Sequence, residues 1–201
     1  PLGAASIGQV HSAIMPDGRE VVVKVQRPDI QRRIKVDLDI LAHFASLMEK
    51  SIKELEVQKP TAIVKEFARS LEKELDYHTE AFHMDRFRHQ FEDDETVAVP
   101  EAIPDLVSEK VLVMECVKGV KCSDREALKK GDYDLKRIAV RGCRLFMEQV
   151  FVHGYFHGDP HPGNIFILKD DVICFIDFGM TGRLGRREKE DFAQLLVEVL
   201  T

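Results

Sequence analysis

The most constraining feature of this 201-residue sequence is a polar segment, 157–164, which reads His-Gly-Asp-Pro-His-Pro-Gly-Asn. Asp159 and Asn164 are separated by four residues, and an Ile-Asp-Phe-Gly segment containing Asp177 begins twelve residues beyond Asn164. One interpretation is purely structural, because Asn, Asp, Gly and Pro form turns, here around a hydrophobic hairpin. The same spacing also suits a specific chemistry.

Phosphoryl transfer from a nucleotide needs three polar groups of this kind. One Asp orients the attacking hydroxyl or water, and an Asn and a second Asp hold the magnesium that bridges the phosphates. Protein kinases carry them as Asp-x-x-x-x-Asn followed by Asp-Phe-Gly, and this sequence keeps that spacing with His-Gly-Asp in place of His-Arg-Asp. We therefore predict Asp159 as the catalytic residue and Asn164 and Asp177 as metal ligands.

The N-terminal stretch, Gly-Ala-Ala-Ser-Ile-Gly-Gln-Val over residues 3–10, compares with the nucleotide-covering pattern G-x-G-x-x-G-x-V. Ala5 replaces the central glycine, and alanine lacks the conformations that bring a backbone close to phosphates. We expect a stiffer loop that crowds the γ-phosphate. The predicted nucleotide-binding residues here are Gly3, Ala4, Ala5, Ser6, Gly8 and Val10.

A lysine follows in an apolar strand predicted over residues 21–25. Lys24 stands 16 residues after Gly8, where kinases place the lysine that binds phosphates. A buried ammonium is costly unless it is paired, so we predict Glu80, on a later helix, as its partner. The alternatives are an edge-strand lysine that reaches solvent and a glutamate on a solvated acidic face.

Two helices are predicted between this strand and the next ones, because apolar residues recur at helical spacing. The first covers 30–53. The second begins at Pro60 with Thr61 as its cap, carries an apolar stripe expected to be mostly core, and brings Glu80 near the face of Glu74 and Asp76. Residues 83–95 are polar and are expected to form a loop or a frayed end.

The second half of the chain is expected to hold the catalytic groups. Strands are predicted at 97–100 and 111–114, a helix over 135–153, and a hairpin of 165–168 with 172–176 that presents Asn164 and Asp177 in one cleft. In kinases the segment after such strands contacts adenine through its backbone. The residues at these positions are Met114 as gatekeeper, with Glu115 and Val117.

Composition limits the other possibilities. The formal net charge of -6 argues against nucleic acid as a partner, and four dispersed cysteines without C-x-x-C favour a reducing compartment. No apolar run reaches a membrane span and no signal peptide is visible, so the fragment is expected to be soluble. The chain begins inside a motif, and we expect it to be part of a longer protein. Histidines spaced by four (153, 157, 161) do not favour zinc, because intervening Gly and Pro residues exclude one continuous helix.

Taken together, three motifs resemble the UbiB/AarF/ADCK family of atypical kinase-like proteins over nearly the whole chain. They are the alanine-rich loop (4–11), Glu74-Leu75-Asp76-Tyr77-x-x-Glu80-Ala81, and the 157–164 segment. The resemblance implies an α+β, two-lobed protein-kinase-like fold. Residues 1–114 would form an N-lobe of antiparallel sheet plus helices, 115–119 a hinge, and 120–201 part of a helical C-lobe.

The resemblance also implies magnesium-dependent ATP binding and ATPase activity rather than demonstrated protein kinase activity. The family role is support of ubiquinone or related isoprenoid-lipid biosynthesis. It is exercised at the cytoplasmic side of a bacterial membrane or in an organelle, with membrane lipids or quinone precursors as partners of the full-length protein. Lys24 and Glu80 match the family's ion pair, and Asp159, Asn164 and Asp177 its catalytic set. Glu74 and Asp76 match its Glu-x-Asp motif, which is associated with an N-terminal Lys-x-Gly-Gln extension.

Two further interpretations stay open. A small-molecule kinase of the aminoglycoside or choline type also carries His-Gly-Asp-x-x-x-x-Asn, although the alanine-rich loop and the Glu-Leu-Asp-Tyr segment point away from it. A nucleotide-binding scaffold without turnover is compatible with Ala5, although the complete Lys, Glu, Asp, Asn and Asp set argues against it. Within the resemblance, Gly3, His157 and Gly158 depart from the residues that many members carry.

Overall fold

The computed structural model describes residues 1–4, 7–51 and 59–200, which group into two compact units. The first unit contains residues 1–79 and 103–114, and the second contains 80–102 and 115–201. The chain therefore passes to the second unit after Thr79, returns to the first after Ala102, and passes to the second again between Met114 and Glu115. Residues 80–102 group with the second unit although the predicted N-lobe included them, and the division into lobes and hinge stays a prediction.

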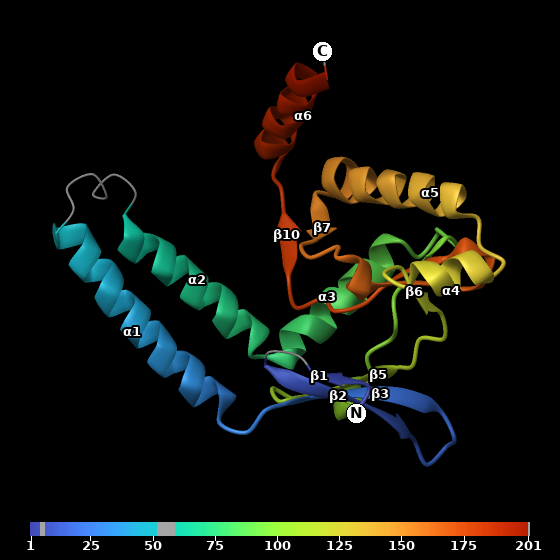
Figure 1. Cartoon of the computed structure of the whole chain (residues 1–201), viewed down its shortest axis with the longest axis horizontal. Coiled ribbons are helices and arrows are strands. Elements are labelled where there is room, and N and C mark those ends of the chain that lie inside the picture. The colour runs from blue at the N-terminus through green and yellow to red at the C-terminus, as the bar shows by residue number, and fades with distance from the viewer. Residues whose placement is uncertain (5–6, 52–58, 201) are drawn as a thin grey trace. The chain divides into compact units, whose positions relative to one another are not determined.

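The first unit is built on a four-stranded sheet with the strand order β1-β2-β3-β5 (Figure 1). Its strands are β1 (Gly3–Ala4), β2 (Gly8–Ile14), β3 (Glu20–Gln26) and β5 (Val111–Glu115). β1 with β2 and β2 with β3 pair antiparallel, and the register places Val10 opposite Lys24. Val22, Lys24 and Gln26 are buried on one face of β3, because every second side chain of a strand points to the same face.

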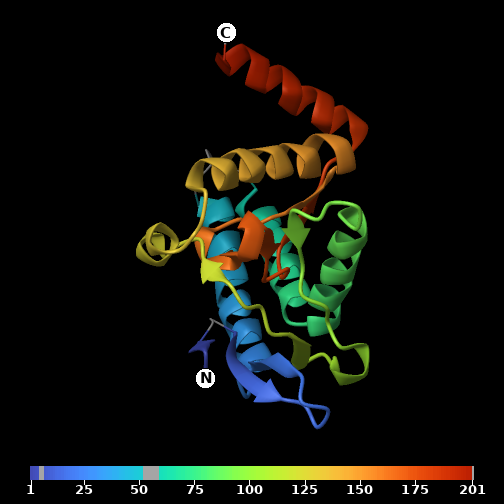
Figure 2. The ribbon, with the colours of Figure 1, turned by 90° about the vertical axis from the view of Figure 1, so that its right-hand side faces the viewer.

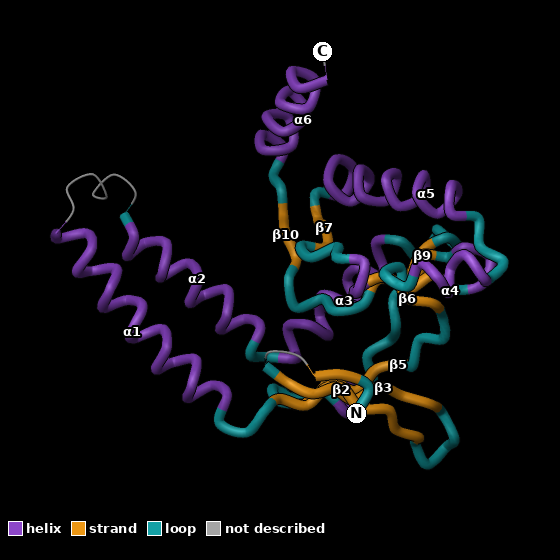
Figure 3. Tube along the Cα trace, in the orientation of Figure 1, coloured by secondary structure: helices purple, strands orange, loops and turns teal. Residues whose placement is uncertain are grey.

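Two helices, α1 (Ile30–Ser51) and α2 (Pro60–Glu74), lie side by side in the same unit (Figures 1 and 3). Thr61 does not cap α2, contrary to the prediction. The residue before the helix is Lys59, in the left-handed region with φ 42°, and it makes no side-chain cap. The Thr61 hydroxyl instead donates to Glu49 Oε2 at 2.6 Å, so this threonine fastens α2 to α1.

The expectation that the apolar stripe of the second helix is mostly core was wrong. Among the residues of α1 and α2 that the structure describes, only Ala45 is buried, while Ile63 and Phe67 are 62% and 50% exposed. Helical periodicity shows that one face is apolar but not how much of it finds a partner. A helix that packs on one neighbour covers only a narrow strip of that face.

The helix that follows, α3 (Tyr77–Gln90), corrects two predictions. The chain breaks at Leu75–Asp76, so Asp76 lies outside any helix and does not share a helical face with Glu80. Residues 83–90 are helical rather than loop. The reason is that Met84, Phe87 and Phe91 recur at helical spacing and are all buried, a pattern that the surrounding polar residues conceal in the sequence.

The second unit holds one mixed sheet and one small ribbon. The sheet has the order β4-β9-β8-β6, with β4 parallel to β9 and the other pairs antiparallel, and β7 pairs antiparallel with β10. The strands are β4 (Val97–Ala98), β6 (Val120–Lys121), β7 (Tyr155–His157), β8 (Ile165–Ile167), β9 (Ile173–Phe175) and β10 (Thr181–Arg183).

Three helices complete this unit: α4 (Arg125–Lys130), α5 (Leu135–Met147) and α6 (Arg186–Leu200). Figure 2 shows α5 as the long gold helix, and it contacts β9. The predicted helix 135–153 changes to a π-helix over Glu148–His153, and Val152 in this π-helix is 67% exposed. A π-turn adds a residue to the turn and so shifts the buried face, which here takes up Gln149 and Val150.

Short 3-10 turns lie at Pro104–Leu106, Pro162–Asn164 and Lys169–Asp171. The last of these joins β8 to β9 and is anchored to α5. Asp171 is buried, accepts from the Asp134 backbone N–H at 3.1 Å and from Arg137 Nε at 2.6 Å, and forms a salt bridge with that arginine. The β8–β9 hairpin is thus held in place from its closed end. Of the described helices, none is both long and apolar enough to cross a membrane.

Candidate active site

The open end of the β8–β9 hairpin brings Asn164 next to Asp177. Ile165 pairs with Phe175, and the Ile176 N–H donates to the Asn164 carbonyl at 2.9 Å, so the residue before β8 meets the residues after β9. Asp177 has φ 63°, which is uncommon for a residue other than glycine. A conformation of this kind at the end of a buried strand redirects the chain, and it lies at the aspartate predicted to be a metal ligand.

Asp159 and Asn164 are in direct contact. Asn164 Nδ2 donates to Asp159 Oδ2 at 3.0 Å and to the Asp159 carbonyl at 3.2 Å. The amide nitrogen therefore faces Asp159, which leaves Asn164 Oδ1 as an acceptor toward other partners. Magnesium prefers oxygen ligands and takes one or two of them from carboxylates, so Asn164 Oδ1 with Asp177 is a donor set that suits this ion.

His157 ties the two polar segments together, a role that the sequence did not reveal. Its Nδ1 accepts from the Asp159 N–H at 3.2 Å, and its Nε2 lies 3.1 Å from the Ile176 carbonyl, to which it donates. Burial lowers the pKa of His157, so the ring is neutral with its proton on Nε2. The Gln149 side chain accepts from the His157 N–H at 3.0 Å, which explains why a glutamine is buried there.

Gly158 is the residue that lets the catalytic segment approach the strand after Asp177. Its N–H donates to the Met180 carbonyl at 2.9 Å, and a Cβ at this position would lie 2.8 Å from Met180 Cγ. A larger residue would push the two segments apart. The glycine in His-Gly-Asp is therefore required by the close approach of β7 and β10.

Glu80 lies in the first turn of α3 and is only 5% exposed, so the solvated acidic face is excluded. Its Oε1 accepts a hydrogen bond from the Phe178 N–H at 3.2 Å. The Phe178 ring is fully buried and packs with Phe87 and His157 at centroid distances of 5.1 and 5.0 Å. The Asp-Phe-Gly segment is thus fixed by a carboxylate on one side and by aromatic packing on the other.

Lys24 lies on β3 in the first unit and is 8% exposed, so it is not an edge lysine that reaches solvent. A Cβ on Gly8 would lie 2.7 Å from both Tyr77 Oη and the Val25 carbonyl, so glycine is needed there. Gly3 and Ala4 form the exposed β1, whereas Ala5 and Ser6 lie outside the described residues. Lys24 and Glu80 belong to different units, and their ion pair stays a prediction.

The remaining predicted residues have local roles that can be stated. Met114 is buried at the end of β5, and the Glu115 N–H donates to the Glu101 carbonyl at 2.9 Å. Contacts of Glu115 and Val117 with adenine stay predictions. Asp76 Oδ1 accepts from the His78 N–H at 2.9 Å and so caps α3, while Glu74 is the last residue of α2.

Among the described residues, no three His, Cys, Asp or Glu side chains gather as a metal cluster. His153, His157 and His161 fall in three different elements: the π-helix, β7 and the segment before a 3-10 turn. Asp159 and Asn164 are in contact, and Asp177 follows the strand that pairs with β8. An antiparallel sheet with helices in the first unit, and this hairpin with helices in the second, are features of a kinase-like α+β protein.

The family follows from comparison with known proteins. The model of the ABC1 atypical kinase-like domain matches residues 1–201, and the chain belongs to this family. A protein from Aliivibrio salmonicida called "Probable protein kinase UbiB" is 39% identical over 202 residues, 98% of this chain and 37% of that protein. The "Uncharacterized protein in hydrogenase 1 5'region" of Clostridium pasteurianum is 38% identical over 94% of this chain and 35% of its own length. The resemblance to UbiB proteins is thereby confirmed, and the chain spans little more than a third of these relatives.

A solved structure confirms the fold class. The complex of Rv3197 with erythromycin from Mycobacterium tuberculosis has a TM-score of 0.75 and is 31% identical. The match covers 91% of this chain and 45% of that chain. Erythromycin is bound by that protein, and the similarity concerns the fold and the family.

Proposed function

We propose that this domain binds Mg-ATP and catalyses transfer of the γ-phosphoryl group, with water as the first acceptor to test. The observation that carries the proposal is the contact of Asn164 Nδ2 with the Asp159 carboxylate, 3.0 Å, beside Asp177 on the same hairpin. Phosphoryl transfer requires one orienting Asp and an Asn and an Asp that hold magnesium, and the contact of Asp159 with Asn164 together with the position of Asp177 just after β9 supports that assignment. Membership of an atypical kinase-like family supports the same class of reaction.

In the proposed mechanism, Asp159 accepts a hydrogen bond from the attacking hydroxyl or water and orients it toward the phosphate. Asn164 fixes the direction of this carboxylate, and the neutral His157 holds the backbone on both sides of the site. Asn164 Oδ1 and Asp177 would hold magnesium, which neutralises charge on the β- and γ-phosphates when it is bound. Lys24, paired with Glu80, would bind the phosphates from the first unit.

The biological role that we propose is support of ubiquinone or related isoprenoid-lipid biosynthesis through ATP hydrolysis. The support for it is the similarity to proteins called probable protein kinase UbiB. The proposed partners of the full-length protein are membrane lipids and quinone precursors. This role would place the protein at the cytoplasmic side of a bacterial membrane or in an organelle.

A second candidate is phosphorylation of a hydroxylated small molecule. The observation that favours it is the fold similarity to a structure that contains erythromycin, a macrolide with several hydroxyl groups. A panel of hydroxylated compounds, aminoglycosides and choline included, tests this candidate by transfer of labelled phosphate. Transfer to one of them at a rate above hydrolysis would replace water as the natural acceptor.

The deciding experiment is ATP hydrolysis by the full-length protein, with and without liposomes and a phenolic quinone precursor. We expect magnesium-dependent phosphate release that rises when membranes and the phenol are present. Asp159→Asn should abolish the release, which excludes a contaminating ATPase. Nucleotide binding without phosphate release under any of these conditions would support a nucleotide-binding scaffold and contradict the proposed activity.

A further inference from the structure

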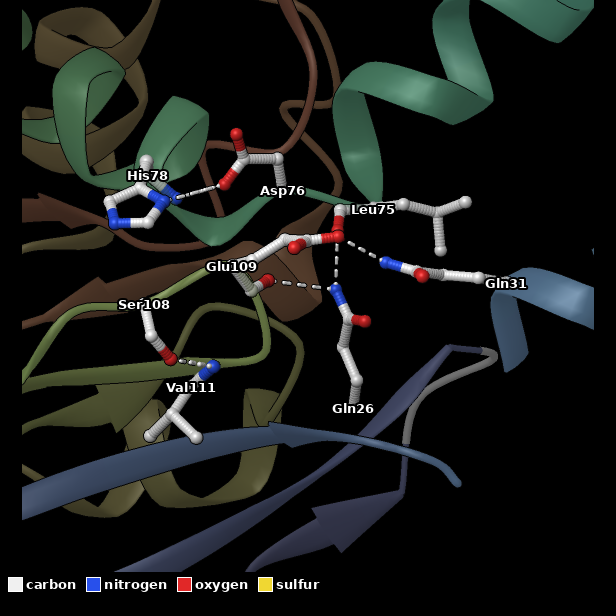
Figure 4. Close-up of polar contacts among 8 residues, drawn as sticks. All are labelled: Gln26, Gln31, Leu75, Asp76, His78, Ser108, Glu109 and Val111. Carbon is white, nitrogen blue, oxygen red and sulfur yellow. Dashed lines mark hydrogen bonds and ion pairs between the residues drawn. The ribbon is translucent and has the colours of Figure 1, made fainter. Parts of the chain in front are cut away.

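A buried glutamine in the first unit links three segments that are distant in sequence (Figure 4). Gln26 is 7% exposed and stands two residues after Lys24 on β3, so both side chains point to the same face of the sheet. Its Nε2 donates to the Leu75 carbonyl at 2.6 Å and to the Glu109 carbonyl at 3.1 Å. One side-chain amide thereby binds two backbone segments.

Both acceptor carbonyls lie near the start of α3. Leu75 is the residue between α2 and the start of α3, and Glu109 lies in the turn before β5. The Glu109 carbonyl also accepts from the Tyr77 N–H at 3.1 Å, and Tyr77 is the first residue of α3. The segment that opens α3 is therefore bound on both sides of Asp76.

Asp76 completes this arrangement from within the segment. Its Oδ1 accepts from the His78 N–H at 2.9 Å (Figure 4). Its carbonyl accepts from the Thr79 N–H at 2.9 Å. These bonds satisfy amides that the first turn of a helix leaves without partners. The next residue of the helix is Glu80, the residue that the proposed function requires to be correctly placed.

The chemistry of the position explains why it is a glutamine. Two carbonyl oxygens must be met by two N–H donors, which a carboxamide has and a carboxylate or a thioether lacks. Reversing the amide would place Oε1 against both carbonyls, so the network fixes its orientation. Gln26 Oε1 has no hydrogen-bond partner among the described residues, so only the NH2 group of this amide forms hydrogen bonds there.

We propose that Gln26 is a positioning residue that sets the N-terminal end of α3 and, through this helix, the place of Glu80. The inference rests on the proposed function, because only a nucleotide-binding kinase-like domain needs Glu80 in one position. It goes beyond that function because the hydrogen bonds of the Gln26 side chain, as far as the described residues show, go to the Leu75 and Glu109 carbonyls and to no predicted nucleotide-binding residue or metal ligand. Its effect on catalysis passes through the Leu75 carbonyl.

Two variants of the full-length protein test it. Gln26→Met keeps the volume and removes both donors, whereas Gln26→Glu places a carboxylate against two carbonyls when ionised and offers one O–H donor when protonated. We expect Gln26→Met to weaken Mg-ATP binding about tenfold at every pH, as loss of a buried hydrogen-bonding group implies. Gln26→Glu should be equally weak at pH 8 and should regain affinity as the pH falls toward 6.

The pH profile separates positioning from general damage. The titratable side chains drawn with this amide are Glu109, Asp76 and His78, and both Gln26 variants keep all three (Figure 4). Recovery must therefore appear in Gln26→Glu alone. Gln31→Met is the matched control, because Gln31 Nε2 donates to the Glu109 side chain at 2.5 Å in a solvent-exposed hydrogen bond, and its removal should leave binding unchanged. Parallel profiles for the two Gln26 variants would overturn the inference.

A second measurement does not depend on nucleotide. Hydrogen exchange of the Tyr77 amide should accelerate at least about tenfold in Gln26→Met, while amides of the β2–β3 ladder keep their protection. If wild type failed to bind ATP but this local acceleration occurred, the proposed function would fail and the Gln26 contact would stand. Uniform acceleration through the sheet, or none at Tyr77, would show that Gln26 does not set the start of α3.

Discussion

Glu80 accepts a hydrogen bond from the Phe178 N–H at 3.2 Å, although 98 positions separate the two residues in the chain. This contact joins the helix that carries the predicted lysine partner to the segment that carries a predicted metal ligand. Phe178 is fully buried, so its N–H has no access to water when the glutamate is removed. The relationship makes the carboxylate of Glu80 both a structural acceptor and the predicted partner of Lys24.

Replacing Glu80 in two ways separates these roles. Glu80→Ala leaves a buried N–H unpaired and should cost about 1–3 kcal/mol of unfolding free energy. Glu80→Gln keeps an acceptor oxygen for Phe178 and should retain most of the stability while losing the ion pair, so ATPase turnover should fall in both variants. Denaturant unfolding and turnover measured on the same samples test this. Full activity in Glu80→Gln, or Lys24 Nζ farther than about 4 Å from this carboxylate with nucleotide bound, would exclude the ion pair.

Asp159→Asn should reduce turnover about a hundred- to ten thousand-fold, the usual contribution of a general base. The asparagine can still accept the hydrogen bond from Asn164, so Mg-ATP affinity should remain within about twofold of wild type by the same reasoning. Isothermal titration and steady-state kinetics measure the two quantities. An equal loss of binding and turnover would show that Asp159 holds the nucleotide rather than the acceptor.

Asp177→Ala should remove most of the stabilisation that Mg-ATP gives the full-length protein. At about a hundred times its dissociation constant, a ligand stabilises by roughly 2.7 kcal/mol, or about 5–11 °C in melting temperature for a protein of this size. Asn164→Ala should reduce the shift less. Asp132→Ala, which removes an exposed loop carboxylate, is the control and should keep the whole shift. A wild-type shift in Asp177→Ala would remove this residue from the metal site.

Ala5→Gly should change nucleotide affinity or the preference between ATP and ADP more than it changes stability, because glycine allows the loop closer to the phosphates. Ala5 lies outside the described residues, so this prediction rests on the sequence. Ala13→Gly, at an exposed position of β2, controls for the general cost of glycine in a strand. Equal affinities of wild type and Ala5→Gly for both nucleotides would contradict the expected role of the alanine.

His157 should remain neutral in the folded protein below its ordinary pKa of 6.5, because burial lowers the pKa. A lowered pKa means that the unfolded chain binds the proton more readily. The contribution to stability is therefore complete above about pH 6.5 and is lost as the pH falls toward the lowered value. Histidine NMR should show the Nε2–H tautomer and a late titration, while the exposed His89, whose pKa is raised, should titrate first. An early titration of His157 would contradict its burial and the hydrogen bond that its Nδ1 accepts from the Asp159 N–H.

The local motifs of this protein could be predicted because the chemistry constrains the spacing. Asp159 and Asn164 had to fall within one turn-rich segment, and Asp177 had to follow a buried strand, so the three positions were visible in the sequence. The strand that carries Lys24 was visible for a similar reason, since a single lysine among valines needs a buried partner. The structure places these residues in the elements expected of them.

The predictions that were wrong concern the residues that a side chain contacts in the folded protein, which the sequence does not specify. Thr61 binds Glu49 rather than capping α2, and Ile63 and Phe67 are exposed although their spacing is helical. Residues 83–90 form a helix because Met84 and Phe87 are buried in the core. Part of that core is the ring of Phe178, which lies about ninety positions later in the chain. Periodicity describes one face of a helix and leaves open what covers it.

The sequence by itself determined which groups are the candidates for the proposed chemistry, since residue type and spacing are local properties of the chain. Only the tertiary structure decided how those groups are held. The hydrogen bond from Phe178 to Glu80, the bridge of His157 between Asp159 and Ile176, and the two bonds of Gln26 all join segments that folding alone brings together. All three sets of hydrogen bonds have the same physical cause, because a buried polar group needs a hydrogen-bond partner. Which group becomes that partner depends on the folded geometry and not on distance along the sequence.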